Sequence, residues 1–132
     1  MKILILGGTG AIGTPLIAIL RQNQDIQICV TSRSEHSSEE NVRYLKADVL
    51  NQSELKNILM RNHWDAVIDF MIYSESVFRQ RIGLLLKSTD QYFFLSSATE
   101  YSDLDEIITE KTPRLLDVTT DKELLAGKPY PI

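Results

Sequence analysis

Cysteine is almost absent from this chain, which has a single one, Cys29, in 132 residues. One cysteine cannot form a disulfide within the chain, and so low a content is typical of proteins in a reducing compartment. Long apolar runs are absent too, because none approaches the roughly 20 residues that a membrane-spanning helix needs. The first two residues precede only four apolar ones, too few for a signal peptide. We therefore expect a cytoplasmic protein without a membrane partner.

The chain also has no excess of basic residues, since it contains 14 Lys and Arg and 18 Asp and Glu, which gives a net charge of −4. Nucleic acid is therefore not the expected partner, because its phosphates favour a basic face. The two histidines, His36 and His63, have no metal-ligand spacing, and we expect no metal site. With 43% apolar and 24% charged residues, the composition is typical of one globular domain over residues 1–132.

Short apolar strands and amphipathic helices alternate along most of the chain. The pattern predicts strands over 2–6, 26–31, 42–46, 66–70 and 91–95, and helices from about 12, 52 and 74, with a short helical stretch over 121–125. Asn51 and Ser74 are the capping residues expected at the second and third helix starts. Alternation of this kind calls for a parallel sheet with helices on both faces. Right-handed crossovers then give the strand order 3-2-1-4-5, an α/β, Rossmann-like doubly wound sheet that is incomplete at its C-terminal side.

A glycine-rich segment, Gly-Gly-Thr-Gly-Ala-Ile-Gly over residues 7–13, directly follows the first predicted strand. Gly7 allows a tight turn, Gly10 lets the backbone approach a pyrophosphate, and Gly13 lets the following helix pack closely. The helix N-terminus offers free N–H groups and a positive dipole end to phosphates. We therefore predict a dinucleotide cradle formed by these glycines with Thr9 and Ile12; the alternative is a glycine-rich turn without a ligand.

The Gly-x-x-Gly-x-x-Gly spacing, together with Phe-Leu-Ser-Ser over residues 94–97, resembles the extended short-chain dehydrogenase/reductase superfamily. This group contains the NAD(P)-dependent epimerases and dehydratases. The resemblance covers residues 1–102 well, whereas residues 103–132 diverge. It implies a nicotinamide dinucleotide cofactor and hydride transfer at a nucleotide sugar or a similar hydroxyl or carbonyl compound.

Three further positions take their roles from this resemblance. Asp48, after the third strand and followed by Val49, matches an aspartate that binds the adenine amino group in relatives; the alternative is a loop aspartate that caps a turn. The end of the fourth strand lines the nicotinamide side in relatives, and Phe70 lies there. That wall departs from the family, which commonly has a histidine followed by small residues where this chain has Asp69 and bulkier ones.

The end of the second strand governs the choice of cofactor. NAD enzymes carry an Asp or Glu there for the ribose hydroxyls. This chain has Thr31, Ser32 and Arg33 instead, and hydroxyls with an arginine suit a 2′-phosphate. The sequence therefore favours NADP(H) over NAD(H), while Arg33 as a solvated loop charge is the alternative.

The catalytic half of the family's site is harder to find. Ser97 matches the serine that orients the reacting oxygen. The family also needs a Tyr-x-x-x-Lys pair for general acid–base work, and none exists in this sequence. Tyr130, which lies 33 residues beyond Ser97, is the candidate tyrosine. We therefore expect the cofactor half of a longer enzyme, truncated and inactive alone.

The rival hypothesis is a non-catalytic dinucleotide-sensing module, in which the sheet edge after the fifth strand pairs with a partner or forms a homo-oligomer.

Overall fold

The computed structural model describes residues 1–96, 101–102, 107–122 and 126. It divides into two compact units, Met1–Leu95 and Ser96–Ile132, and each is described by itself. The assignment of residues 1–132 to one domain stays a prediction. Among the residues described, no helix combines the length and the apolar character that crossing a membrane requires.

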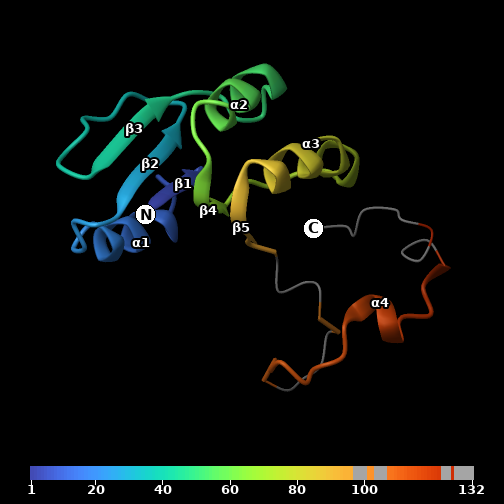
Figure 1. Ribbon diagram of the computed structural model, residues 1–132. Helices are drawn as coiled ribbons and strands as arrows, with labels where there is room; N and C mark the ends of the chain where they lie inside the picture. The colour runs from blue at the N-terminus through green and yellow to red at the C-terminus, as the bar shows by residue number, and fades with distance from the viewer. Residues whose placement is uncertain (97–100, 103–106, 123–125, 127–132) are drawn as a thin grey trace. The chain divides into compact units, whose positions relative to one another are not determined.

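The first unit is built on a five-stranded parallel sheet (Figure 1). Its strands are β1 (Lys2–Leu6), β2 (Gln27–Ser32), β3 (Val42–Lys46), β4 (Trp64–Asp69) and β5 (Thr89–Phe94). They follow the order β3-β2-β1-β4-β5, so the predicted topology is confirmed. The predicted bounds of β2, β4 and β5 differ from these by one or two residues, because apolar pattern fixes strand ends poorly.

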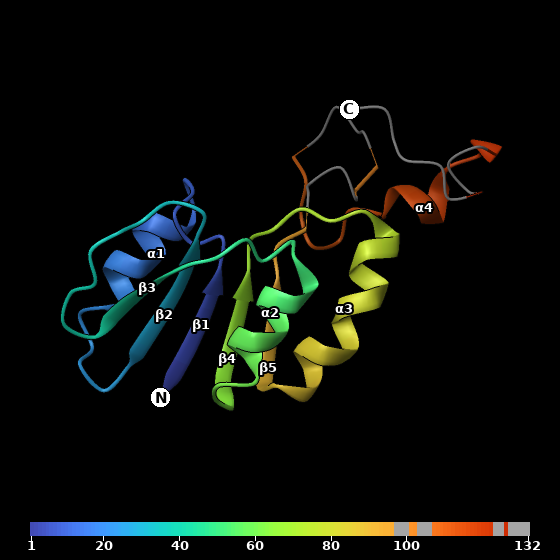
Figure 2. The same ribbon diagram turned by 90° about the horizontal axis from the view of Figure 1, so that it is seen from above.

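Three helices cover the two faces of this sheet: α1 (Gly13–Leu20), α2 (Gln52–Leu59) and α3 (Glu75–Lys87). Figure 2 shows α1 on one face, with α2 and α3 on the other. Alternation along β1 supplies both cores, since Ile3 and Ile5 pack with Ile17 of α1, whereas Leu4 and Leu6 pack with the apolar sides of α2 and α3. A central strand buried on both faces explains the continuous apolar run after Lys2.

Two helix starts were predicted from capping residues, and they differ in the outcome. Asn51 caps α2, because its Oδ1 accepts hydrogen bonds from the N–H groups of Ser53 and Glu54 at 2.9 and 3.3 Å. Ser74 stands at the N-cap of α3, but its hydroxyl lies 3.1 Å from the Ser76 hydroxyl and makes no capping bond, so that part of the prediction is wrong. The α2 cap fixes the backbone just after β3, which borders the candidate site described below.

The second unit contains the short helix α4 (Leu115–Val118), which the sequence pattern did not predict. An isolated antiparallel bridge pairs Tyr101 with Arg114 just before it. Most of the helix predicted over residues 121–125 lies outside the described residues.

Candidate functional site

A cavity of about 350 Å³ lies at the carboxyl edge of the sheet, beyond the ends of β1, β2 and β3. Ligands of open parallel sheets bind at this edge. Seven of the residues predicted to hold a cofactor line it: Gly7, Thr9, Gly10, Ser32, Arg33, Asp48 and Val49. The topology therefore brings together residues that are up to 42 positions apart in the sequence.

Three other predicted residues, Ile12, Gly13 and Phe70, do not line this cavity. Ile12 is the N-cap of α1, and Gly13 is its first residue and is buried. Phe70 is partly buried against the core that packs on α1. Ser97 and Tyr130 lie outside the described residues. Their roles stay predictions.

The turn after β1 depends on glycine at two places. Gly7 has a φ of +70°, a left-handed conformation that glycine adopts without steric cost. A Cβ added there would also lie 2.7 Å from the sulfur of Met71, which lines the cavity. No role was predicted for Gly8 from the sequence. A Cβ added to Gly8 would lie 2.8 Å from side-chain carbons of both Ile5 and Val30. The turn thus lies tightly against the sheet.

The two later glycines of the motif have different surroundings. A Cβ on Gly13 would lie only 2.2 Å from the carbonyl oxygen of Gly8, so the start of α1 touches the loop backbone. A Cβ on Gly10 would meet nothing nearer than the carbonyl oxygen of Gly7 at 3.9 Å. Gly10 therefore leaves open space at the cavity wall, as a cradle for a pyrophosphate requires.

Thr31 also lines the cavity, but backbone groups occupy its hydroxyl. Its Oγ1 accepts a hydrogen bond from the Gly7 N–H at 3.2 Å and donates to the Ile5 carbonyl at 3.4 Å, and the residue is 1% exposed. Thr31 therefore holds the glycine turn. Among the described residues no side chain pairs with the guanidinium of Arg33, which is exposed at the cavity rim.

The loop after β3 forms the opposite wall. Asp48 accepts a hydrogen bond from the Leu50 N–H on Oδ1 at 3.0 Å, so it does cap a turn, as the alternative reading held. Its own N–H donates to the Glu54 carboxylate at 2.9 Å. The second carboxylate oxygen of Asp48 has no partner among the described residues and remains available to a ligand.

A buried polar cluster surrounds Asp69 at the end of β4, next to the cavity-lining residue Met71. Asp69 is fully buried and accepts hydrogen bonds from the Met71 N–H at 2.9 Å, the Tyr73 hydroxyl at 3.0 Å and the Tyr92 hydroxyl at 2.8 Å. Burial raises the pKa of the Asp69 carboxyl, and these donors oppose the shift. Burial and the neighbouring Asp69 also raise the pKa of both tyrosines, which stay neutral.

Arg81 of α3 connects this cluster to the loop after β3. The side chain is 2% exposed, lies over the Tyr73 ring at 4.4 Å and donates to the Leu50 carbonyl at 3.1 Å. Because Leu50 and Met71 both line the cavity, the cluster holds two of its walls. The sequence indicated only that Asp69 was unusual for its place. Met71 and Tyr73 are its neighbours in the sequence, whereas Tyr92 of β5 and Arg81 of α3 join the cluster through the tertiary fold, which no local pattern predicts.

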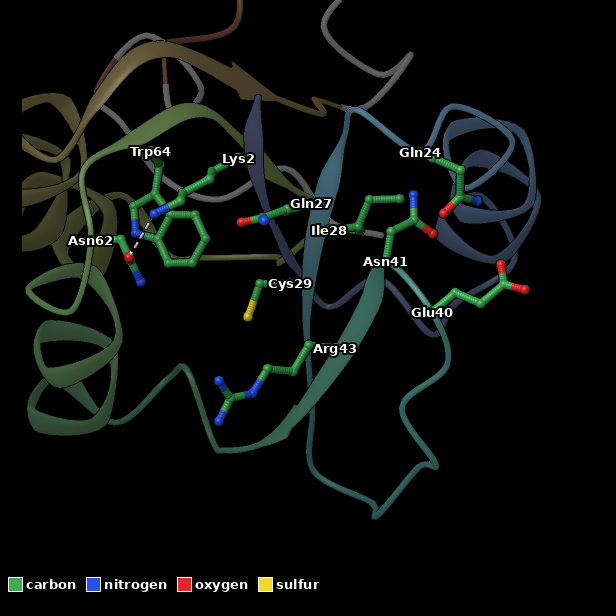
Figure 3. Close-up of a pocket in the computed structure, with 10 residues that line it drawn as sticks. All are labelled: Lys2, Gln24, Gln27, Ile28, Cys29, Glu40, Asn41, Arg43, Asn62 and Trp64. Carbon is green, nitrogen blue, oxygen red and sulfur yellow. Dashed lines mark hydrogen bonds between the residues drawn. The ribbon is translucent and has the colours of Figure 1, made fainter.

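A second hollow of about 490 Å³ lies at the amino edge of the sheet, at the starts of β1 to β4 (Figure 3). Lys2 donates to Asn62 there at 3.2 Å, and Cys29 faces it from β2. Burial raises the pKa of the Cys29 thiol to about 11, so the thiol is a poor nucleophile. Within the described part of the chain, no group of three His, Cys, Asp or Glu side chains could hold a metal ion.

A comparison with family models places the chain in a family. The model of the saccharopine dehydrogenase NADP-binding domain matches residues 3–78, more than half of the chain. No curated protein is significantly similar to the sequence. The matched region contains the glycine turn and the end of β2, together with the loop after β3.

Solved structures confirm the predicted resemblance at the level of the fold. The UDP-Glc/GlcNAc 4-epimerase of Campylobacter jejuni has a TM-score of 0.71 and 20% identity over 86% of this chain and 42% of its own. The UDP-glucuronic acid 4-epimerase of Bacillus cereus, solved with NAD, has a TM-score of 0.67 and 16% identity over 86% of this chain and 46% of its own. The chain thus spans less than half the length of these structures, and carries the NAD(P)-binding Rossmann fold that they share.

Proposed function

Since the chain belongs to the family of saccharopine dehydrogenase NADP-binding domains, we propose that the carboxyl-edge cavity binds NADP(H) in preference to NAD(H). One observation carries the preference: the guanidinium of Arg33 is exposed at the rim of the cavity and has no partner among the residues that the structure describes. The strand β2 ends without an acidic residue, and the next one in the sequence, Glu35, forms an ion pair with Lys46 at 3.0 Å. A 2′-phosphate would therefore meet a positive charge and no carboxylate that repels it.

The glycine turn supplies the pyrophosphate part of the site. Helix α1 begins at Gly13, and no side chain caps its N-terminus. Within the helix, Thr14 and Leu16 already donate their N–H groups to the Gly10 and Ile12 carbonyls at 3.0 and 3.3 Å, and Pro15 has no N–H. The N–H groups that this end can offer an anion are therefore those of Gly13 and of the loop before it, where the helix dipole favours negative charge. The open space at Gly10 gives the pyrophosphate access to these groups, and Thr31 holds Gly7 in the conformation the turn needs.

The adenine part of the site lies between the end of β2 and the loop after β3. The free carboxylate oxygen of Asp48 can accept a hydrogen bond from the adenine amino group, and Val49 offers apolar contact beside it. The Asp48 backbone is fixed on both sides, because its N–H donates to the Glu54 carboxylate and its carbonyl accepts from the Asn51 N–H at 3.0 Å. A prepositioned acceptor loses little entropy when the ligand binds.

For the whole protein we propose oxidoreduction at a hydroxyl or carbonyl carbon, with a nucleotide sugar as the substrate class. The bound nicotinamide would supply or accept the hydride. By the resemblance, Ser97 would orient the reacting oxygen, and Tyr130 is the candidate proton donor. The cofactor half of this proposal rests on the cavity; the substrate half rests on the likeness to epimerases and dehydratases.

The test is a fluorescence titration of the purified chain with NADPH and with NADH, repeated for Arg33→Ala. Loss of a charge-assisted hydrogen bond costs about 1.5–3 kcal/mol, so we expect the Kd for NADPH to rise about tenfold or more while that for NADH stays within about twofold. Arg43→Ala is the matched control, since Arg43 lies on β3 at the amino-edge hollow and should affect neither ligand. An unchanged NADPH affinity in Arg33→Ala would contradict the proposal.

A further inference from the structure

The loop of residues 33–41, between β2 and β3, is tied to both neighbouring elements. Glu35 pairs with Lys46 of β3 at 3.0 Å, and Glu39 pairs with Arg21 at the end of α1 at 3.1 Å. Each pair is exposed and contributes little stability alone. Two backbone hydrogen bonds between Glu39 and Val42, at 2.9 and 2.7 Å, add to these pairs and hold the end of the loop against β3.

Within this loop His36 contacts the end of β2. Its Nε2 lies 3.1 Å from the Ser32 hydroxyl oxygen, and its ring lies against Tyr44 of β3 with 5.1 Å between the centroids. Ser32 lines the cavity next to Arg33, whereas His36 does not. His36 can therefore act on a ligand in the cavity only through Ser32.

The hydrogen bonds of Ser32 determine what its hydroxyl can offer a ligand. The Ser34 N–H already donates to the Ser32 oxygen at 3.2 Å. A hydroxyl has one proton and two acceptor positions. When Nε2 of His36 carries a proton and donates as well, both acceptor positions are filled, and the Ser32 proton is free for the cavity. When Nε2 lacks a proton, the Ser32 proton bonds to His36 instead.

We propose that His36 is a positioning residue that sets the preference for the 2′-phosphate by orienting the Ser32 hydroxyl toward it. This inference rests on the proposed binding of NADP(H). A phosphate beside Arg33 accepts hydrogen bonds and donates none when fully ionised, so it favours the arrangement in which Ser32 donates to it and His36 donates to Ser32. Hydrogen bonds in such a chain strengthen one another. A ligand with a free 2′-hydroxyl gains much less from this arrangement.

The experiment measures Kd for NADPH, NADH and adenosine 2′,5′-bisphosphate with His36→Phe, Ser32→Ala and the double variant. His36→Phe retains a ring against Tyr44 and removes Nε2. We expect this variant to raise the Kd for NADPH and for the bisphosphate about threefold to tenfold, which is the range for the loss of one neutral hydrogen bond. The Kd for NADH should rise less than about twofold. Ser32→Ala should weaken the two phosphate ligands about tenfold. In the Ser32→Ala background, His36→Phe should have no further effect.

Two variants separate this role from a general effect on folding. His36→Gln can place an amide nitrogen close to the position of Nε2, and we expect it to retain most of the NADPH preference. His63→Phe is the matched control, because His63 is exposed and pairs with Asp90 at 2.7 Å, away from the cavity. Circular dichroism melting of each variant establishes that the fold is retained.

The outcomes are distinguishable from failure of the proposed function. A wild-type chain that prefers NADPH, with the same preference in His36→Phe, would overturn only the inference about His36. Equal weakening of NADPH and NADH, or an effect that persists in the Ser32→Ala background, would overturn it too. A wild-type chain without a preference for NADPH would overturn the proposed function and this inference with it.

Discussion

Gly10 and Gly13 belong to one motif, yet the structure predicts opposite consequences for alanine at the two positions. Neither has a positive φ, so the backbone accepts alanine at both, and the difference lies in what the new methyl group would meet. At Gly13 it would lie 2.2 Å from the Gly8 carbonyl oxygen, whereas at Gly10 its nearest neighbour would be 3.9 Å away. Gly13→Ala should therefore damage the fold, and Gly10→Ala should damage ligand binding.

The magnitudes follow from these contacts. A backbone atom must move to admit the Gly13 methyl group, and overpacking of this kind costs about 1–3 kcal/mol. For a chain of this size the melting temperature should fall by roughly 4–12 °C. Gly10→Ala should keep the stability of the wild type or gain about 0.4–1 kcal/mol, since alanine restricts the unfolded chain. Its methyl group would displace the pyrophosphate from at least one N–H, which corresponds to roughly tenfold or more in Kd.

The assay pairs thermal melting by circular dichroism with NADPH titration of both variants. The expected pattern is a lower melting temperature for Gly13→Ala, and wild-type melting with weakened binding for Gly10→Ala. Normal NADPH affinity in Gly10→Ala would show that the pyrophosphate does not lie in the space beside Gly10. Wild-type stability of Gly13→Ala would refute the close contact with Gly8.

Three other perturbations test the interior. Arg81→Met removes a buried charge and should lower the free energy of unfolding in urea by about 3–5 kcal/mol. Arg79→Met breaks only an exposed pair on the same helix and should lower it by less than about 1 kcal/mol. Equal losses in the two variants would contradict the buried cluster. Cys29, with its pKa raised to about 11, should react with iodoacetamide at pH 8 at least about a hundredfold more slowly in the native chain than in urea, and equal rates would contradict its burial. Thr31→Val leaves the Gly7 N–H without its partner and should lower the free energy of unfolding by about 1–3 kcal/mol. Thr31→Ser, which retains the hydroxyl, should recover most of this loss. A Thr31→Val chain as stable as the wild type would show that the hydroxyl does not hold the turn.

The strand order and the position of the cavity could be predicted because both follow from local patterns. Continuous apolar runs after Lys2 and before Asp69 mark strands buried on both faces, and the intervening amphipathic segments require right-handed crossovers. Given that order, the ends of β1, β2 and β3 must meet at one edge. The glycine turn, Arg33 and Asp48 were therefore expected at one site, and they do line one cavity.

The contacts within the site depend on tertiary packing and could not be predicted in the same way. The sequence places Thr31 where NAD enzymes have the residue that binds the ribose, but its hydroxyl is already bonded to the Gly7 N–H and the Ile5 carbonyl. Tyr92 of β5 and Arg81 of α3 join Asp69 from separations that no spacing rule predicts. The pairing of Ser32 with His36 depends on how the loop of residues 33–41 folds back on β3.

The most direct test of the account is the relative affinity of the wild-type chain for NADPH and NADH, measured by fluorescence titration at one fixed ionic strength. The salt concentration must be constant, because the 2′-phosphate adds charge to the ligand. The account predicts saturable binding of both ligands at one site per chain, with NADPH at least about tenfold tighter. Tighter binding of NADH, or no binding of either ligand, would contradict the assignment of the carboxyl-edge cavity as an NADP(H) site.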